Sequence, residues 1–493
     1  MASPRYPSLF QVNTRLRLSE LSATLGRPAT LDDVTDAELD RLAGDAFDLV
    51  WFLGVWQTGD AARRVSASNP EWLAEYQRVL LDFRESDVSG SCFAVRDYHV
   101  HIDFGGDEAL ARLRARLRAR GLRLVLDFVP NHVAPDHRWV EEHPDFFIAG
   151  SEERLAAEPQ NYRRLQTASG PRIFAYGRDP YFAGWPDTLQ LNYGNTALQD
   201  ALLGELRRIA HQCDGVRCDM AMLVLPEVFE KTWGISSQPF WPRAAAALHA
   251  EIPGFLFLAE VYWDLEWTLQ QQGFDYTYDK RLYDRLVHGL AGPVRGHLQA
   301  GLDFQDHLAR FLENHDEPRA AAAFTPDVHR AAAVITFLSP GLRFFHQGQR
   351  EGKRVRIPMH LGRGPSEVPD AAIAAFYDDL IACLKDRAFR DGQWQLLDAR
   401  PAWQGNGTND NFITVAWTGP GSIRRLVAVN YADHQSQCYV ALPWDDLAGR
   451  TWRLHDRLGG AVYDRDGADL SVRGLYLDMP AWGYHAFEVE GSR

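Results

Sequence analysis

The feature that most constrains the fold is a regular alternation of short apolar runs with amphipathic helical segments over some 380 residues. Eight runs are predicted as strands: 8–13, 48–54, 123–129, 214–219, 255–260, 274–279, 308–314 and 342–348. Helical segments lie between them at 107–120, 196–211, 240–251, 326–338 and 370–386. Strands that are apolar on both faces and separated by helices predict a closed parallel (β/α)8 TIM barrel of class α/β.

Two stretches depart from this repeat and define the expected domains. Residues 133–190, after the third strand, are rich in aromatic, proline and polar residues, and an excursion this long predicts a small subdomain over the barrel mouth. Beyond Arg390, short alternating runs broken by Gly, Asn and Asp predict an antiparallel β-sandwich. We therefore expect a catalytic barrel at 1–132 and 191–390, an inserted subdomain at 133–190 and a C-terminal sandwich at 391–493.

Composition excludes several classes of partner. The net charge of −14 argues against nucleic acid, which selects a basic surface. The arginine-rich stretch 111–123 has leucines at helical spacing and is predicted as a solvated helix face. No stretch has the apolar length of a membrane helix, and the N-terminus lacks a secretory apolar core. Five scattered cysteines without metal-ligand spacing are typical of reduced thiols, so we expect a complete cytoplasmic protein.

Polar side chains collect where four of the predicted strands end. The stretches "DFVPNH", "GVRCDMA", "FLAEVYW" and "ENHDEP" supply Asp127, Asn131, His132, Arg217, Asp219, Glu260, His315 and Asp316. One aspartate after a strand is often only a helix N-cap. Four strands that end in carboxylates at the same rim of a barrel instead predict a catalytic site.

These four stretches resemble the four signature regions of the α-amylase family of glycoside hydrolases (glycoside hydrolase family 13), in the same order on the same strands. The stretch "DTLQLNYGN" (187–195) is similar to that family's additional short motif. The resemblance covers the whole chain, including the inserted subdomain and the C-terminal sandwich. It implies an enzyme acting on small α-glucosidic carbohydrates.

The resemblance implies that Asp219 is the nucleophile, Glu260 the general acid/base and Asp316 the carboxylate that stabilises the transition state. Retaining glycosidases require two such carboxyl groups about 5–5.5 Å apart. Arg217, on the same strand face as Asp219, is expected to hold that carboxylate ionised. Glu260 has to keep a proton near neutral pH, and its flanking residues Phe257, Val261, Tyr262 and Trp263 are expected to supply an apolar environment.

The remaining site residues are assigned by the same resemblance. His132, Arg217, His315 and Phe93 are predicted to bind substrate, with Phe93 standing where the family usually has a stacking tyrosine. Asp127 and Asn131 are predicted as structural support. A histidine at a strand end is often structural, and that alternative stays open for His132 and His315. Aromatic residues of the insertion are expected to close the pocket from above: Tyr181, Phe182, Trp185 and Tyr193.

Besides Phe93, two departures from the family limit the expected substrate. Met222 and Leu223 stand where classical α-amylases have a Lys-His pair, which weakens the case for cleavage of long starch chains. The basic residues Arg350, Lys353, Arg354 and Arg356 follow the eighth strand, and salt bridges are favoured over an anionic acceptor site. Relatives use the asparagine matching Asn131 to bind calcium, but the sequence identifies no further ligands, so no metal or other cofactor is assigned.

The leading prediction is thus a retaining enzyme that hydrolyses or transfers short α-glucosides. The alternatives are a dedicated transglycosylase, a sucrose or disaccharide phosphorylase, and an isomerase. A catalytically silent barrel that acts as a binding module is a distant alternative, since binding alone does not require Asp219, Glu260 and Asp316 together. The oligomeric state is left open.

Overall fold

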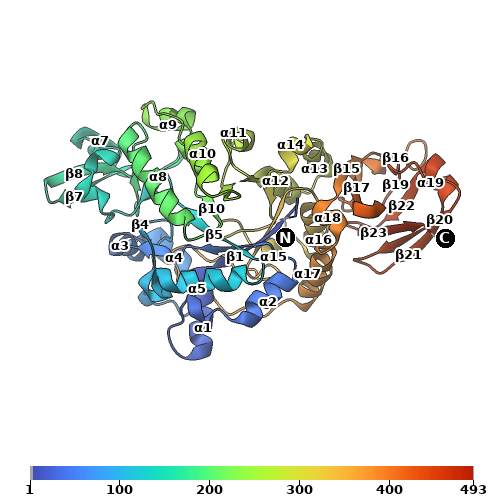
Figure 1. The fold of residues 1–493 in the computed structure, drawn as a ribbon, viewed down its shortest axis with the longest axis horizontal. Coiled ribbons are helices and arrows are strands. Elements are labelled where there is room, and N and C mark those ends of the chain that lie inside the picture. Colours follow the sequence, from blue (N-terminus) through green and yellow to red (C-terminus); the bar gives the residue numbers. More distant parts are fainter. Residues whose placement is uncertain (1–3, 492–493) are drawn as a thin grey trace.

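The computed structural model describes residues 4–491, so the first three and last two residues of the expected domains lie outside it. Eight strands form a closed parallel barrel, as predicted (Figure 1). In chain order they are β1 (Ser8–Asn13), β2 (Leu49–Leu53), β5 (Arg123–Phe128), β10 (Gly215–Cys218), β11 (Leu256–Ala259), β12 (Tyr276–Tyr278), β13 (Leu308–Arg310) and β14 (Leu342–His346). Each overlaps one predicted run, and β1 closes the ring by pairing with both β14 and β2.

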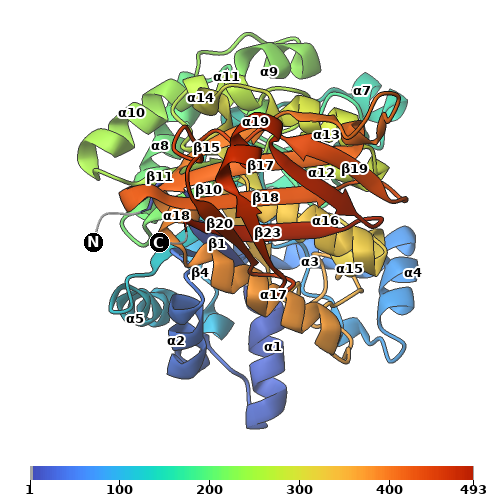
Figure 2. The same cartoon turned by 90° about the vertical axis from the view of Figure 1, so that its right-hand side faces the viewer.

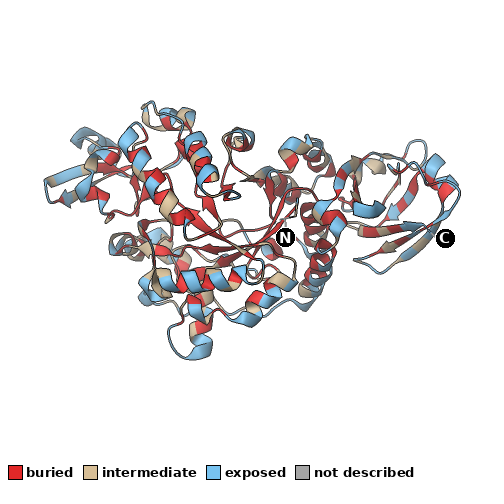
Figure 3. Cartoon of the chain, in the orientation of Figure 1, coloured by how far each residue is buried: buried red, intermediate tan, exposed pale blue. Residues whose placement is uncertain are grey.

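The strands are apolar on both faces because the barrel has an internal core and an outer layer of helices. Every residue of β2, β10, β11 and β14 is buried. The covering helices include α5 (Gly106–Arg118), α8 (Thr196–Ala210), α10 (Trp241–Glu251), α16 (Pro326–Phe337) and α17 (Ala371–Leu384). Figure 3 shows their buried faces toward the barrel and their exposed faces toward solvent. The helical periodicity therefore located these elements to within two residues.

The segment after β5 forms small sheets of its own. Strand β6 (His132–Val133) pairs with β9 (Leu189–Gln190), which brings the two ends of the insertion together. Between them lie α6 (Trp139–Glu142), α7 (Glu152–Ala157) and the hairpin β7 (Tyr162–Thr167)–β8 (Gly170–Ala175). The segment between β2 and β5 holds β3 (Trp56–Thr58), α3 (Asp60–Ser68), α4 (Pro70–Val79) and β4 (Val95–Val100). The sequence analysis did not predict this second group.

The C-terminal part is antiparallel, as predicted, and lies at the opposite end of the molecule from the β7–β8 hairpin (Figures 1 and 2). One sheet has the order β15 (Gln393–Leu397), β17 (Phe412–Gly419), β18 (Ile423–Asn430), β23 (Tyr484–Gly491), β20 (Thr451–Asp456) and β21 (Val462–Asp466). A second contains β16 (Ala399–Pro401), β19 (Ser436–Val440) and β22 (Leu475–Met479). Trp417 Nε1 donates to the Leu338 carbonyl at 2.9 Å, which ties the larger sheet to the barrel.

Two rim loops are joined across the barrel mouth by a structure that we call the clasp, residues 87–90 with 360–363. The Ser89 and Gly90 N–H groups donate to the His360 carbonyl, and the Gly362 N–H donates to the Asp87 carbonyl. Arg363 adds a bidentate ion pair with Asp87, with both N···O distances at 2.8 Å. The first loop belongs to the segment between β2 and β5 and the second to the segment after β14, so the clasp joins segments that follow the two strands on either side of β1.

Among residues 4–491, no helix is long and apolar enough to cross a membrane.

Candidate active site

The carboxyl ends of the parallel strands bring the predicted acidic residues to one rim. Arg217 lies on β10, and Asp219 follows two residues later on the same face. Glu260 follows β11 directly, and Asp316 lies in the loop after β13. Asp219 and Glu260 are each only 4% exposed. The barrel therefore places these side chains together although they are far apart in the sequence.

A single guanidinium group joins two of the three carboxylates. Arg217 Nη1 lies 2.7 Å from Asp219 Oδ1, and Nη2 lies 2.7 Å from Glu260 Oε2. The Arg217 side chain is fully buried, beneath the Phe93 ring at 4.9 Å and the Trp51 ring at 5.2 Å. It is not among the residues that line the cavity, and its contacts are with the two carboxyl groups and not with the space where a substrate would bind. Arg217 is a positioning residue for the two carboxyl groups.

Glu260 is held by two further donors. The Met220 N–H donates to Oε2 at 2.7 Å, and the Tyr262 hydroxyl donates to Oε1 at 2.9 Å. Burial raises the pKa of Glu260 to about 7, because the nearby carboxylates of Asp219 and Asp316 add to desolvation and Arg217 only partly offsets them. A group with this pKa is suited to general acid catalysis near neutral pH.

The apolar environment of Glu260 differs in part from the prediction. Tyr262 contacts the carboxyl group through its hydroxyl, so its role is polar. Phe257 packs against His249 of α10 and against Phe274, on the outside of the barrel. Its side chain lies on the other face of β11 because side chains alternate along a strand. Burial by the barrel as a whole, and not by Phe257, raises the pKa of Glu260.

The other two carboxylates have opposite electrostatic environments. Burial raises the pKa of Asp219 above its usual range, although Arg217 opposes that shift. For Asp316, desolvation by burial is outweighed by His315 and Arg217, which hold the pKa of this carboxyl below its usual range. His315 Nε2 lies 3.0 Å from Asp316 Oδ2, and its Nδ1 lies 2.8 Å from Gln11 Nε2. His315 thus keeps Asp316 ionised.

These residues surround a cavity of about 340 Å³. Its lining is Trp72, Ser91, Phe93, His132, Trp185, Asp187, Thr188, Asp219, Met220, Glu260, Tyr262, Asp316, Met359 and His360. Burial lowers the pKa of His132 to about 4, so this imidazole is neutral and can exchange hydrogen bonds with a hydroxyl group. His315 lines a neighbouring cavity instead.

The two predicted support residues lie beneath the cavity. Asp127 accepts from Trp51 Nε1 at 3.1 Å and from the Gly54 N–H at 2.7 Å, while its Oδ1 is 3.9 Å from Arg217 Nη1. Its main contacts therefore hold the end of β2, with Arg217 more distant. Asn131 contacts the end of the insertion through Gln190. Both residues have contacts that support the rim structurally.

Several residues expected around the substrate lie elsewhere. Of the four aromatic residues of the insertion, only Trp185 lines the cavity. Phe182 is 72% exposed, and Tyr193 is buried against Phe229 and Phe240, with its hydroxyl donating to the Pro130 carbonyl. Met222 and Leu223 are likewise buried in the core. In the stretch that follows Asp219, the residue that lines the cavity is Met220.

Sequence reasoning missed several lining residues, among them Trp72, Asp187 and His360. Asp187 belongs to the quoted motif at 187–195, but nothing in the motif indicated that its side chain faces the cavity. Trp72 and His360 come from segments far apart in the chain, and their rings stack with centroids 4.2 Å apart. No local sequence signal predicts such a contact.

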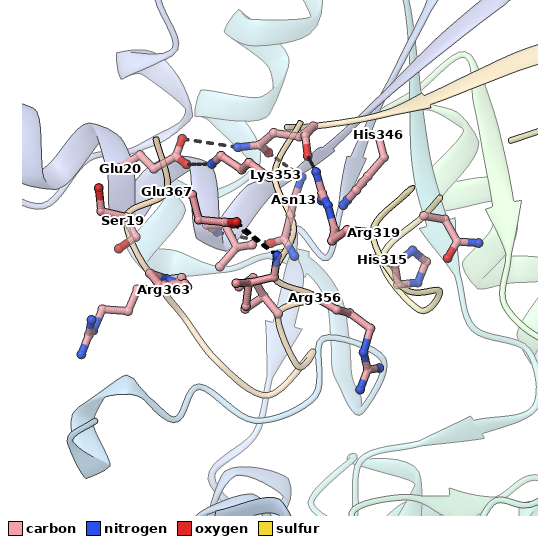
Figure 4. Close-up of a pocket in the computed structure, with 18 of the residues that line it drawn as sticks. Asn13, Ser19, Glu20, His315, Arg319, His346, Lys353, Arg356, Arg363 and Glu367 are labelled. Carbon is pink, nitrogen blue, oxygen red and sulfur yellow. Dashed lines mark hydrogen bonds and ion pairs between the residues drawn. The ribbon is translucent and has the colours of Figure 1, made fainter. Parts of the chain in front are cut away.

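The neighbouring cavity, of about 420 Å³, lies at the ends of β1, β13 and β14 and is shown in Figure 4. It is lined by basic residues that the sequence analysis expected to form salt bridges. Lys353 pairs with Glu20 at 3.1 Å and Arg356 with Glu75 at 2.6 Å. Nearby, Arg350 pairs with Asp45 at 2.9 Å. For these three residues the salt-bridge prediction is confirmed.

Comparisons with known proteins agree with this geometry. The model of the α-amylase catalytic domain matches residues 85–278, which contain Phe93, His132, Arg217, Asp219 and Glu260. The chain is 22% identical over 311 residues to Alpha-amylase 3 of Dictyoglomus thermophilum, covering 57% of this chain and 58% of that protein. It is 28% identical over 279 residues to the Alpha-1,4-glucan:maltose-1-phosphate maltosyltransferase of Burkholderia pseudomallei, covering 55% of this chain and 21% of that protein.

The stretch 85–278 is thus similar to the α-amylase catalytic domain. Solved structures with the same fold include the maltogenic α-amylase AmyB from Thermotoga neapolitana, with a TM-score of 0.68, 17% identity and 99% of each chain covered. The α-amylase from Geobacillus thermoleovorans, solved in complex with acarbose, superposes with a TM-score of 0.67 at 16% identity over 100% of each chain. In sequence, the chain spans only 58% and 21% of the lengths of the two curated α-amylase-family relatives.

The α-amylase family implies a calcium ion near Asn131, and the residues present do not fit one. Three oxygens converge on Gln190 Nε2: the Asn131 carbonyl at 3.0 Å, Asn131 Oδ1 at 2.9 Å and the Leu191 carbonyl at 3.1 Å. An amide NH2 donates to these oxygens, whereas calcium would need them as ligands. Among the residues that the structure describes, no group of three or more His, Cys, Asp or Glu side chains is arranged to hold a metal ion.

The Gln190 contacts predict a specific stability effect. Gln190→Glu replaces the donor with a carboxylate oxygen that faces three oxygens in a buried position, so we expect unfolding free energy to fall by about 3–5 kcal/mol. Denaturant unfolding measures the loss. Gln393→Glu, at an exposed position of β15, is the matched control and should change stability little. A chelator should leave the melting temperature of the unmodified protein unchanged. A stable Gln190→Glu variant without added calcium would contradict this account.

Proposed function

We propose that this protein is a retaining enzyme that hydrolyses or transfers short α-glucosides through a covalent glycosyl-enzyme intermediate. The observation that carries the proposal is the shared contact of Asp219 and Glu260 with the Arg217 guanidinium, beside a cavity that Asp316 also lines. One guanidinium group holds the two carboxyl groups close together. A nucleophile and an acid about 5–5.5 Å apart define the retaining arrangement in glycosidases.

The roles follow from the environment of each group. Asp219 is available as a nucleophile once it is deprotonated, and Arg217 orients its carboxylate toward the anomeric carbon. Glu260, with its raised pKa, protonates the leaving oxygen and then removes a proton from the incoming acceptor. Asp316, kept ionised by His315, stabilises the positive charge that develops on the sugar ring. Water as the acceptor gives hydrolysis, and a sugar gives transfer.

The order of strands around the rim supports a short substrate. In the closed barrel, β11 lies opposite β1, so Glu260 faces the sector that the clasp crosses. The general acid marks the side of the leaving group, and the opposite side therefore belongs to the transferred sugar. The clasp joins the rim segments on that side, and its residue His360 lines the cavity. A groove for long glucans requires open space there.

The alternative functions differ in the molecule that accepts the transferred sugar. Similarity to a maltosyltransferase in part of the chain favours transfer as an outcome beside hydrolysis, and phosphorolysis or isomerisation uses the same intermediate. A silent binding role gives no reason for the three ionisable groups around one buried arginine. The five buried free cysteines are typical of a reducing compartment, which supports a cytoplasmic location as part of the proposal. Product analysis on a panel of α-glucosides, with and without phosphate, distinguishes the outcomes.

The nucleophile is tested by Asp219→Asn. The change is nearly isosteric, so folding should persist, while kcat on an activated aryl α-glucoside should fall by more than about a thousandfold. Asp398→Asn, at an exposed position, is the control for loss of one negative charge. Turnover of Asp219→Asn within tenfold of the unmodified enzyme would rule out Asp219 as the nucleophile.

The acid is tested by leaving group and pH together. Glu260 must be protonated to act, and its pKa of about 7 means that the protonated fraction falls as pH rises through that value. For α-glucosides with poor leaving groups, kcat/KM should therefore decline above about pH 7, and it should also decline in acid as Asp219 becomes protonated. Glu260→Gln should remove the alkaline limb and slow poor leaving groups far more than activated ones. Equal losses on both substrate types would assign Glu260 another role.

Substrate length is tested with a series from disaccharide to heptasaccharide and soluble starch. Because the clasp closes the side of the transferred sugar, kcat/KM should be highest for disaccharide-sized α-glucosides and level or lower for longer ones. Each further subsite in a long groove would instead raise kcat/KM with chain length. Cleavage in the middle of starch chains would show that the clasp does not close the cavity.

A further inference from the structure

Asp187 is a buried carboxylate without a hydrogen-bond partner, and it lines the catalytic cavity. It is 3% exposed, and the structure of residues 4–491 gives it no hydrogen bond. His360 Nε2 lies 3.6 Å from Asp187 Oδ2, which is too far for a hydrogen bond. A buried carboxylate is costly unless donors satisfy it. The cavity is where a ligand can supply those donors.

The position of Asp187 identifies which part of a ligand it meets. His360 belongs to the clasp, which joins the segments after the strands on either side of β1, and Glu260 follows β11, the strand opposite β1 in the barrel. Trp72 stacks on His360 and lines the same wall. Asp187 therefore lies on the wall away from the general acid. On that wall, the cavity holds the part of the transferred sugar farthest from the scissile bond.

We propose that Asp187 accepts hydrogen bonds from the 4-hydroxyl of the transferred sugar and from a neighbouring hydroxyl, and thereby selects the sugar. This inference rests on the proposed function. In a pyranose ring C4 lies across from C1, so its hydroxyl points away from the reacting centre toward this wall. An ionised carboxylate only accepts hydrogen bonds, and adjacent hydroxyls are a matched pair of donors.

A carboxylate at this position is expected to favour a sugar that carries the 4-hydroxyl and to reject a sugar that lacks it. A sugar with the hydroxyl in place satisfies the carboxylate, and one that lacks it leaves a buried charge unpaired. Sites built in this way reject the analogue without the hydroxyl strongly, because the protein group stays unpaired. Asp187 would thus act as a specificity-determining residue that touches the substrate but takes no part in proton transfer or nucleophilic attack.

The test compares 4-nitrophenyl α-glucoside with its 4-deoxy analogue in the unmodified enzyme and in Asp187→Asn and Asp187→Ala. In both variants, kcat/KM for the glucoside should fall by about tenfold to a hundredfold, as expected for lost hydrogen bonds to a charged group. The 4-deoxy substrate should lose much less, so the ratio between the two substrates collapses toward unity. Glu153→Gln, an exposed carboxylate on α7 of the same insertion, is the control and should leave the ratio unchanged.

Melting temperatures of the variants separate a folding defect from a change in selectivity, and the substrate ratio is insensitive to the fraction of folded enzyme. Equal losses on the two substrates would overturn the role of Asp187. A loss seen only with disaccharides, and not with the nitrophenyl glycosides, would place Asp187 on the leaving side and overturn it too. If the unmodified enzyme turns over no α-glucoside while Asp187 variants fold normally, the proposed function fails instead.

Discussion

The site depends on one buried cation. Arg217 has no solvent contact, and a guanidinium in that position needs anionic partners close by. Asp219 and Glu260 supply them at 2.7 Å, and Asp127 lies further away at 3.9 Å. Three carboxyl groups around one positive charge cannot all be fully compensated. Glu260 is poorly stabilised as an anion, with its pKa raised to about 7, so the charge cluster that holds the Asp219 carboxyl group also favours the protonated form of Glu260.

Asp316 and Glu260 have different neighbours, which shift the pKa values of the two carboxyl groups in opposite directions. His315, itself held by Gln11 of β1, lies beside Asp316 and favours its ionised form. Glu260 instead receives hydrogen bonds from neutral donors, Met220 N–H and the Tyr262 hydroxyl. Environments that push the pKa values of neighbouring carboxyl groups apart give them different tasks on one rim. The environment of Asp316 requires the ring of strands to close, since Gln11 and His315 come from opposite ends of the barrel sequence.

Sequence predicted what is local or periodic. The eight strands follow from apolar runs and the helices from their spacing, and Asp219, Glu260 and Asp316 follow from strand ends that resemble family motifs. It did not predict contacts between remote loops. The clasp joins Asp87 to Arg363, and Trp72 meets His360, through pairings that no local pattern encodes. The sequence analysis expected Tyr193 in the pocket because it is aromatic, but its ring packs against Phe229 in the core. Likewise, the convergence of three oxygens on Gln190 is visible only once β6 and β9 pair.

The clasp also has a consequence for the order of events in a catalytic cycle. In the proposed reaction the clasp lies behind the transferred sugar, so the leaving side of the cavity, beside Glu260, serves as the doorway for the other reactants. The departing group leaves through that doorway, and the next molecule enters through it only afterwards. Water and sugar acceptors then compete for one vacated position, next to the same Glu260 carboxylate. Tyr262 and Met220 line the cavity and contact Glu260, so under the proposed function they are the residues expected to bias the choice between hydrolysis and transfer.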